Sequence, residues 1–485
     1  MRLTKLIGII LFVTLTACVH EAMGESVISS GDVLTLDEAI NIAMANNKEI
    51  AEARQGVSVS MHKVREAKSA GGVSFGLQGQ ISRTEETSEM TSASPTPAYY
   101  DTTMPFDYMG NNPSYTPPAN PLDMSHTITT LTGPVKTSSI TIGDKESKNV
   151  VFSLKKPLYT FGKISRGISI AKNGYRSEEL NLLRVRQKVI LDVQTAYYYC
   201  LLAEEGVRVS EEALKQAQSH LDAATARFNA GAVPEFDVIR ARVDVASAQE
   251  QLTTARSGLS LAKKALNNVL GLPLNTGFKY VLPDKMEMNF TLSVDKCKEI
   301  ALNNRIDLQR LRMTTQQIEL GADAQRMRPV VAFTANYGIV AEGSLFAKDD
   351  TWTAAVAVDV PLFDSGASHS KVAGSKATAD KLRITESRLV DGINLEVEAA
   401  FDSMKEAQAR VETSATIVEQ AKEAVRMAEQ GYENGVTPHI NVIDAQTALT
   451  GALMNHAKAL YDLETAMAKL AYAMGLDSIQ QSYEK

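Results

Sequence analysis

The chain has 485 residues, a formal net charge of −7 and a pI near 5.7. This acidic balance argues against a nucleic-acid-binding protein, which normally carries a basic face. Three cysteines are too few for a disulfide scaffold, and none of them forms a CxxC pair. Apolar residues make up 44% of the chain, enough for a folded core, while an aromatic content of only 6% favours long Ala-rich helices.

The first residues have the pattern of an export signal. Arg2 and Lys5 precede an apolar stretch over 6–15 that is too short for a membrane helix. It ends in Leu-Thr-Ala-Cys at 15–18, which resembles a bacterial lipobox. We therefore expect a signal peptide over 1–17 and a lipid on Cys18. Ordinary cleavage nearby, for example after Gly24, is the alternative.

Beyond Cys18 the sequence has no run of about 18 consecutive apolar residues, so it predicts no transmembrane helix. Only helices and closed barrels satisfy their backbone groups in lipid. A membrane-inserted part of this chain would therefore have to be a β-barrel.

Two segments of the chain repeat each other. Leu34-Thr-Leu-Asp37 corresponds to Leu292-Ser-Val-Asp295, 258 residues later, and Pro157-Leu-Tyr159 corresponds to Pro361-Leu-Phe363, 204 residues later. Such internal similarity indicates repeated structural units. We predict a first repeat over 34–272, a linker over 273–291, a second repeat over 292–476 and a C-terminal tail over 477–485.

The first repeat carries extra residues that the second lacks. Between Thr84 and Val135 there is no Lys or Arg, and eight of the 15 prolines fall between Pro95 and Pro134. This composition predicts a long acidic surface loop over 83–148.

Each repeat is expected to contain a helix, two strands, a very long helix, a sharp turn and a return helix. In the first repeat the helices and strands cover about 36–68, 72–82, 148–158, 165–229 and 236–270. In the second they cover about 294–326, 330–341, 351–361, 368–433 and 440–474.

The long helices carry an apolar stripe with the 3-4 spacing of a coiled coil, and many of its positions are Ala, which permits close helix approach. No proline interrupts the chain between Pro157 and Pro234 or between Pro361 and Pro438. About 64 helical residues span about 95 Å. Such a length suits a helical tube rather than a globular domain.

The expected strands alternate in character, with small or polar residues on one side. Two hairpins give about four strands, whereas the smallest single-chain barrels have about eight. Four strands leave open edges in lipid, so a barrel would have to close by oligomerisation.

Three sets of residues resemble the outer-membrane efflux protein family, the TolC-like channels. They are the opening motif Leu34-Thr-Leu-Asp-Glu-Ala39 with Asn46-Asn47, the Pro-Leu-aromatic strand ends at 157 and 361, and the tip motifs Arg227-Phe-Asn-Ala-Gly-Ala-Val-Pro234 and Gly431-Tyr-Glu-Asn-Gly-Val-Thr-Pro438. The resemblance covers nearly all of the mature chain.

This resemblance implies a mainly α-helical chain with membrane β-structure. Three copies would form a 12-stranded β-barrel in the outer membrane, continued by a coiled-coil tube of α-helices in the periplasm, with the linker in an equatorial region. The homotrimer would be the exit duct of a tripartite efflux or type I secretion system. Its partners would be a periplasmic adaptor, an inner-membrane transporter and outer-membrane lipid.

The resemblance also places a closed periplasmic entrance at the two tip turns, where the adaptor would dock. Gly231 and Gly435 suit the left-handed conformation that ends a helix. Pro234 and Pro438 suit the first turn of the next helix.

Five residues near these turns are the expected gate. They are Asp237, Tyr432, Thr437, Asn441 and Asp444. Asp237 matches an acidic tip position, Asp444 matches a member of an acidic ring, and the Tyr432 hydroxyl would bond an acid such as Asp237. Thr437 and Asn441 depart from the basic residue and second acid that some members carry. Each acid has an alternative role as a charge that the helix dipole favours at a helix start.

No catalytic motif is present, so we expect no enzyme activity, no cofactor and no metal site. His456 falls on the packing stripe, where neighbours would satisfy it, and His439 is expected to be a solvated turn residue. Cys200 and Cys297 are expected to be ordinary packing residues on helices.

The alternative function is a periplasmic adaptor, a structural lipoprotein with a long helical hairpin. The twofold repeat and the strand pair in each repeat argue against this. Drug, metal and protein substrates are not distinguished by the sequence, because a wide duct makes few specific contacts.

Overall fold

The computed structural model describes residues 33–83, 88–94, 136–142, 146–281, 290–342, 351–434 and 436–478. The expected lipidation site Cys18 and the tip residue Gly435 lie outside these residues. The chain divides into two compact units. Unit 1 comprises residues 1–63, 171–319 and 376–485, and unit 2 comprises residues 64–170 and 320–375.

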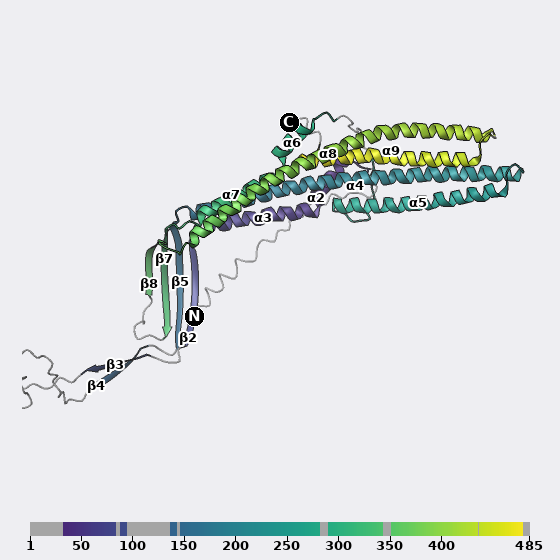
Figure 1. Cartoon of the computed structure of the whole chain (residues 1–485). Coiled ribbons are helices and arrows are strands. Elements are labelled where there is room, and N and C mark those ends of the chain that lie inside the picture. The colour runs from purple at the N-terminus through teal and green to yellow at the C-terminus, as the bar shows by residue number, and fades with distance from the viewer. Residues whose placement is uncertain are drawn as a thin grey trace, which may run out of the picture. The chain divides into compact units, whose positions relative to one another are not determined.

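The chain contains the same order of helices twice. The first set is α2 (Leu36–Asn46), α3 (Lys48–Ser69), α4 (Lys163–Asn229) and α5 (Glu235–Leu270). The second set is α6 (Val294–Asn304), α7 (Ile306–Ala324), α8 (Ala367–Glu433) and α9 (His439–Ala473). The bounds of α4 and α8 agree with the predicted long helices, and α4, α5, α8 and α9 run side by side (Figure 1). None of the helices in the described residues is both long and apolar enough to cross a bilayer.

The helices of unit 1 enclose two apolar cores. One gathers buried residues of α2–α5 together with Ala457 and Tyr461 of α9, and the other gathers residues of α6–α9. Cys200 and Cys297 are fully buried, one in each core, as the sequence indicated. At the edge of the first core, the Tyr197 hydroxyl lies 2.8 Å from the Leu34 carbonyl oxygen and 2.6 Å from that of Val281. These contacts fix β1 (Val33–Leu34) and its parallel partner β6 (Lys279–Tyr280) against α4.

Each short helix pair is broken where the sequence predicted one continuous helix. At the first break, called the first junction, Asn47 is extended and its carboxamide oxygen accepts from the backbone N–H of Glu49 at 2.8 Å. This oxygen caps α3, which explains the break. The amide nitrogen of Asn47 donates to the Val269 carbonyl at 2.8 Å and so ties the break to the end of α5.

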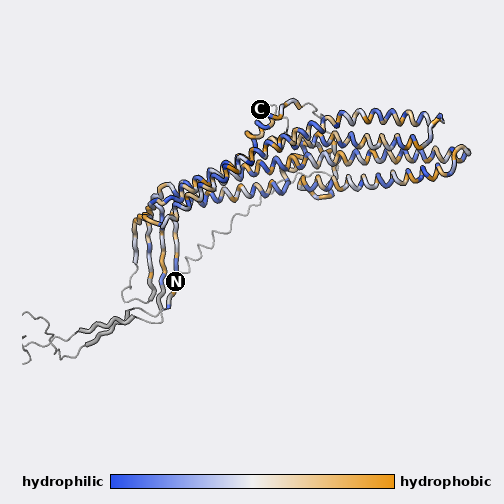
Figure 2. Tube along the Cα trace, in the orientation of Figure 1, coloured by the Kyte–Doolittle hydropathy of each residue, from blue (hydrophilic) through white to orange (hydrophobic). Residues whose placement is uncertain are grey.

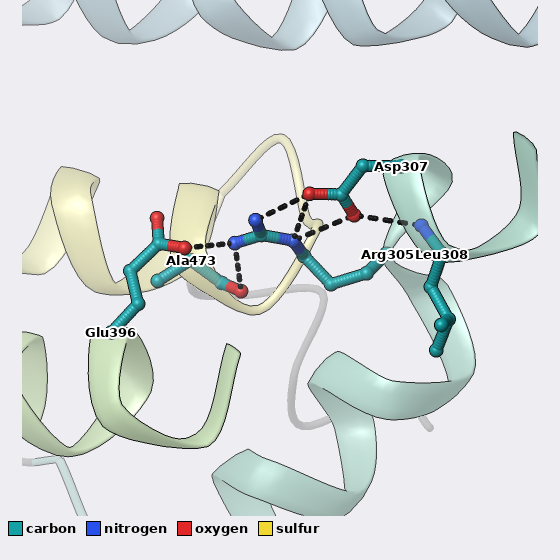
Figure 3. Close-up of polar contacts among 5 residues, drawn as sticks. All are labelled: Arg305, Asp307, Leu308, Glu396 and Ala473. Atoms are coloured by element: carbon teal, nitrogen blue, oxygen red, sulfur yellow. Dashed lines mark hydrogen bonds and ion pairs between the residues drawn. The ribbon is translucent and has the colours of Figure 1, made fainter. Parts of the chain in front are cut away.

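The second junction has Arg305 at the corresponding position (Figure 3). The Arg305 guanidinium is buried, with 5% of its side chain exposed, and it reaches Asp307 at 2.6 Å and Glu396 at 2.7 Å. It also donates to the Ala473 carbonyl at 3.2 Å, at the end of α9. Asp307, the second residue of α7, accepts in turn from the Leu308 N–H at 3.0 Å. A buried guanidinium with two partly exposed carboxylates thus replaces the neutral amide of the first junction.

A glycine ends each return helix against these junctions. Gly271 and Gly475 both have φ of 75°, in the left-handed region. A Cβ on Gly271 would lie 2.5 Å from the Asn46 carbonyl oxygen, and a Cβ on Gly475 would lie 3.1 Å from that of Asn304. Both positions therefore require glycine, and the first is the tighter.

Unit 2 contains an antiparallel four-stranded sheet in the order β2-β5-β7-β8. Its strands are β2 (Ser74–Arg83), β5 (Glu146–Tyr159), β7 (Val330–Glu342) and β8 (Thr351–Asp359). The register pairs Leu77 with Phe152, Phe152 with Tyr337, and Tyr337 with Trp352 across the whole sheet. Because paired residues share a face, one row of aromatic and aliphatic side chains crosses all four strands.

The two faces of this sheet differ sharply. The apolar face contains Phe75, Leu77, Ile81, Phe152, Leu154, Val331, Phe333, Tyr337, Ile339, Trp352, Val356 and Val358. The opposite face carries mainly small and polar residues, among them Gln78, Ser153, Asn336 and Thr353. Phe75 is 80% exposed and Trp352 is 75% exposed, so the apolar face is open in the isolated chain. The alternation along the strands can be followed in Figure 2.

Part of the expected acidic loop over 83–148 is a strand ladder instead. β3 (Ser88–Ser94) pairs with β4 (Lys136–Ile142) in an antiparallel two-stranded sheet, and β5 already begins at Glu146. Within 83–148, the stretches 84–87, 95–135 and 143–145 lie outside the described residues.

Candidate functional site at the helix tips

The first tip turn joins α4 to α5. The Ala232 N–H donates to the Arg227 carbonyl and the Gly231 N–H donates to the Phe228 carbonyl, both at 2.9 Å. This is the Schellman pattern, which requires a left-handed residue at the position that Gly231 occupies with φ of 72°. Pro234 is extended and directly precedes α5. The chain thus reverses between the two helices as the sequence predicted.

The second tip turn folds back on α8. The backbone N–H groups of Val436 and Thr437 both donate to the Gly431 carbonyl, at 2.8 and 3.2 Å. The Thr437 side chain lies so close to α8 that a Cβ on Gly431 would be 2.6 Å from its hydroxyl oxygen. Thr437 was singled out from the sequence because a basic residue is absent at this position. In the structure its side chain packs within its own turn. Pro438 is extended and directly precedes α9.

The candidate acids lie at the starts of the return helices. Asp237 is half-buried in the first turn of α5, where the helix dipole favours a negative charge. On α9, Asn441 and Asp444 are both exposed in the isolated chain. Their roles in a gate stay predictions.

An aromatic contact joins the two tips. The Arg227 guanidinium, in the last turn of α4, lies 4.1 Å from the ring centre of Tyr432, in the last turn of α8. Such a cation–π contact contributes about 0.5–1 kcal/mol at an exposed site. The sequence placed both residues in the tip motifs but did not predict their contact, because they are far apart in the chain. The expected bond from the Tyr432 hydroxyl to Asp237 stays a prediction.

A second contact between the helices runs through a side-chain amide. The amide nitrogen of Gln446 on α9 lies 2.6 Å from Nε2 of His220 on α4 and donates at 3.1 Å to the Glu429 carboxylate on α8. None of these three residues had been singled out from the sequence. A groove of about 340 Å³ between α4, α5 and α9 has His220 and Gln446 in its lining, together with Asp244 of α5.

His456 lies in the packing between α8 and α9. Nδ1 of His456 lies 2.9 Å from the Ser414 hydroxyl oxygen, so the expectation that packing neighbours satisfy His456 is confirmed. The side chain of His439 lies outside those described. No group of three His, Cys, Asp or Glu side chains in the described residues converges on a possible metal position.

A family model and several known proteins match this chain. The family model of outer membrane efflux proteins matches residues 122–272 and 299–476. The alkaline protease secretion protein AprF of Pseudomonas aeruginosa is 21% identical over 69% of this chain and 70% of its own length. The cobalt-zinc-cadmium resistance protein CzcC of Cupriavidus metallidurans is 23% identical over 65% of this chain and 74% of its own length.

Solved structures have the same fold. The CmeC outer membrane channel of Campylobacter jejuni superposes with a TM-score of 0.67 at 17% identity, covering 91% of this chain and 85% of that one. The VceC outer membrane protein of Vibrio cholerae gives 0.65 at 16% identity, covering 91% and 96%. The fold, mostly helical with a sheet, is therefore that of TolC-like channels.

Proposed function

The chain belongs to the outer membrane efflux protein family, and on this basis we propose that it is the exit duct of a tripartite efflux or secretion system. Members of this family are outer-membrane proteins that extend into the periplasm, and this chain is one of them. In the proposed role the duct carries substrates from an inner-membrane transporter and a periplasmic adaptor to the exterior.

The observation that carries this proposal is the two-faced sheet of unit 2. The apolar face, with Phe75, Leu77 and Trp352, is largely exposed, whereas Gln78, Asn336 and Thr353 lie on the other face. A sheet that is apolar outside and polar inside suits a barrel wall between lipid and a water-filled lumen.

The edges of this sheet support closure by further copies. Among the strands that the structure describes, β2 pairs only with β5 and β8 pairs only with β7. Open edges are not tolerated in lipid, since each unpaired backbone group there costs several kcal/mol. We propose that β2 of one chain pairs with β8 of the next in a trimer, which gives a closed barrel of twelve strands.

The helix tips would form the periplasmic entrance of the duct. Three chains would bring three copies of Asp444, and of Asp237, towards one axis, where their charges draw cations and deter anions. The Arg227–Tyr432 contact would replace the salt-bridge lock that Thr437 cannot supply. The tip turns at Gly231, Pro234, Gly435 and Pro438 would receive the adaptor.

The substrate stays open in this proposal. One relative is named for protease secretion and another for cobalt, zinc and cadmium resistance. A duct of this kind takes its substrate from the transporter with which it assembles, so the transporter would decide what this chain carries.

The sheet orientation can be tested with the chain's single tryptophan, Trp352. In liposomes made with brominated phospholipid, we expect strong quenching of its fluorescence, because bromine on the acyl chains quenches only an indole in contact with lipid. Planar-bilayer recordings of the same protein should show ion-conducting channels.

A matched control moves the indole to the other face. In the double variant Trp352→Phe/Thr353→Trp, the new indole should resist the brominated lipid and respond to aqueous acrylamide. Equal lipid quenching at both positions, or a folded monomer as the main species in detergent, would contradict the proposed barrel.

The gate residues need a separate measurement. If Asp444 lines a narrow entrance, Asp444→Ala should reduce the cation preference of the channel and its block by multivalent cations. If both properties stay unchanged, Asp444 is only a charge at the start of a helix.

A further inference from the structure

The amide of Gln446 has a defined orientation. Its nitrogen lies 3.1 Å from a carboxylate oxygen of Glu429, and an ionised carboxylate only accepts hydrogen bonds. Turning the amide would place oxygen against oxygen. The NH₂ group therefore faces Glu429, and the same nitrogen is the one that lies 2.6 Å from His220.

This orientation fixes the state of the His220 ring. One hydrogen of the Gln446 amide points to Glu429 and the other to Nε2 of His220. A nitrogen that accepts a hydrogen bond carries no proton, so the imidazole is neutral with its proton on Nδ1. The three side chains form a relay from α4 through α9 to α8.

We propose that this relay is a proton-sensitive link between the two helical hairpins α4–α5 and α8–α9, in a proposal that rests on the tips being the entrance of the duct. While His220 is neutral the link holds. A proton on Nε2 would set N–H against NH₂ at 2.6 Å, and the amide cannot turn its oxygen to the ring without facing it to Glu429. Acid therefore releases α9 from α4 near the tip.

The charges around the ring define the competing outcome. Glu429 of α8 lies behind the Gln446 amide, and Asp244 of α5 lines the groove with His220. On the same helix as the ring, Asp222 lies two residues away, and Asp444 lies two residues before Gln446 on α9. If a protonated His220 moved onto one of these carboxylates, acid would tighten the tips instead of releasing them. An imidazole side chain ordinarily changes its charge between about pH 5 and 8.

The test is the pH dependence of channel opening in planar bilayers. Between pH 7.5 and 5.5, loss of one hydrogen bond should raise the open probability about fivefold per chain. In His220→Gln, an amide replaces the ring. The amide does not titrate, so its hydrogen bond is kept on acidification and the rise in open probability should fall below about twofold. An unchanged rise in His220→Gln, or a fall in wild-type opening on acidification, would overturn the proposal.

Two further variants separate the relay from a general effect of acid. In Glu429→Gln, the Gln446 amide can turn and accept from a protonated His220, so the response should shrink although the histidine remains. In His456→Gln, the response should stay at the wild-type level, because His456 and its partner Ser414 both belong to the α8–α9 hairpin. A wild-type response in Glu429→Gln would count against the relay.

A distance measurement keeps the link testable without channel activity. Spin labels on Ala223→Cys and Ala448→Cys, both exposed, would report the separation of α4 and α9, since the native Cys200 and Cys297 are buried. In preparations diluted with unlabelled chain, the distance should lengthen or broaden at pH 5.5 and not in the His220→Gln background. The same distance at both pH values refutes the link, whereas absent conductance with a pH-dependent distance refutes only the duct.

Discussion

The two junctions bind the ends of their return helices with different side chains: the first uses a neutral amide and the second a guanidinium. Asn47 and Arg305 stand at the same point of the helix break, and each donates to a carbonyl at the end of its return helix, Val269 or Ala473. Asn47 also caps the next helix with its side-chain oxygen, whereas the Arg305 guanidinium has no acceptor and donates to Asp307 in the first turn of α7. The same backbone arrangement at the helix break is therefore stabilised by two different kinds of side chain.

The acids around the junctions explain how this is possible. Glu49 and Asp192 occupy the positions in the first half that Asp307 and Glu396 occupy in the second. In the first half their cation is Lys188, which lies 3.0 Å from Glu49 and 3.9 Å from Asp192 on the surface of α4. In the second half the cation is Arg305, buried between the helices. The pair of acids is kept, but the cation comes from the helix break instead of from the long helix.

The largest difference between the junctions should appear on removing the central side chain. Arg305→Ala leaves Asp307 and Glu396 without their cation and should lower the free energy of unfolding by about 3–5 kcal/mol. Asn47→Ala loses a cap and one hydrogen bond and should cost about 1–2 kcal/mol. Denaturant unfolding followed by far-UV circular dichroism measures both. Arg305→Lys, which keeps the charge without the paired hydrogen bonds, is the control, and equal losses at the two junctions would show that burial of the ions is unimportant.

Substituting Gly271 and Gly475 should also lower the free energy of unfolding by different amounts, but here the larger loss is expected at the first junction. Gly475→Ala introduces a left-handed alanine and should cost about 1–2 kcal/mol. Gly271→Ala adds a Cβ 2.5 Å from a backbone oxygen, against 3.1 Å for Gly475, so it should cost about 1–3 kcal/mol more. A larger loss for Gly475→Ala would mean that the first junction can shift to admit a methyl group.

Acid should loosen the second junction before the first. Burial opposes the ionisation of Asp307, but hydrogen bonds and the charge of Arg305 outweigh it, so the pKa of Asp307 lies below its usual value. The stability that Asp307 contributes is therefore present above the ordinary Asp pKa of about 3.9 and is lost as the pH falls below it. In the first half, burial raises the pKa of Asp192, which gives the opposite dependence.

Hydrogen exchange of peptides from the two breaks, corrected for intrinsic rates, would resolve this contrast. Between pH 5 and about 3, protection should fall around residues 299–308 and change less around residues 41–50. Equal loss of protection in both peptides would show that acid acts on unit 1 as a whole.

The smallest effect is expected on giving the second junction the exposed lysine of the first. Gly392 is the counterpart of Lys188, and a Cβ there meets no atom within 4 Å. In an Arg305→Asn background, Gly392→Lys should recover about 0.2–1 kcal/mol beyond Gly392→Ala, the control for helix propensity, because an exposed ion pair contributes that much. Recovery should weaken in high salt. No difference between the Lys and Ala variants would show that the acids need a buried cation.

The sequence predicted the long elements well because their signals are long. Two proline-free stretches and the apolar stripe predicted α4 and α8 to within two residues of their observed starts. It missed the breaks at Asn47 and Arg305, since a single extended residue hardly disturbs a helical pattern. It also missed β3 and β4, because proline and acidic residues dominate the composition of that region.

At the tips, the sequence identified the turns and not the contacts between them. Gly231 and Pro234 announce a turn by their own backbone preferences. Arg227 with Tyr432, and His220 with Gln446 and Glu429, meet only when two hairpins pack together. No local pattern in one hairpin encodes its partner in the other, so these pairs required the structure.

The pairing of the sheet has a consequence for the order of folding. β2 and β5 join positions such as Ser74 and Lys155, and β5 meets β7 at Phe152 and Tyr337, with α4 and α5 between them in the chain. Contacts so distant in sequence form slowly, because a long loop must close before they are made. We expect the helices to form first and the strands to wait. During that delay Phe75 and Trp352 remain in water on unpaired strands, which are prone to aggregate. The apolar face that would suit the proposed barrel to lipid therefore leaves the unfinished chain open to aggregation.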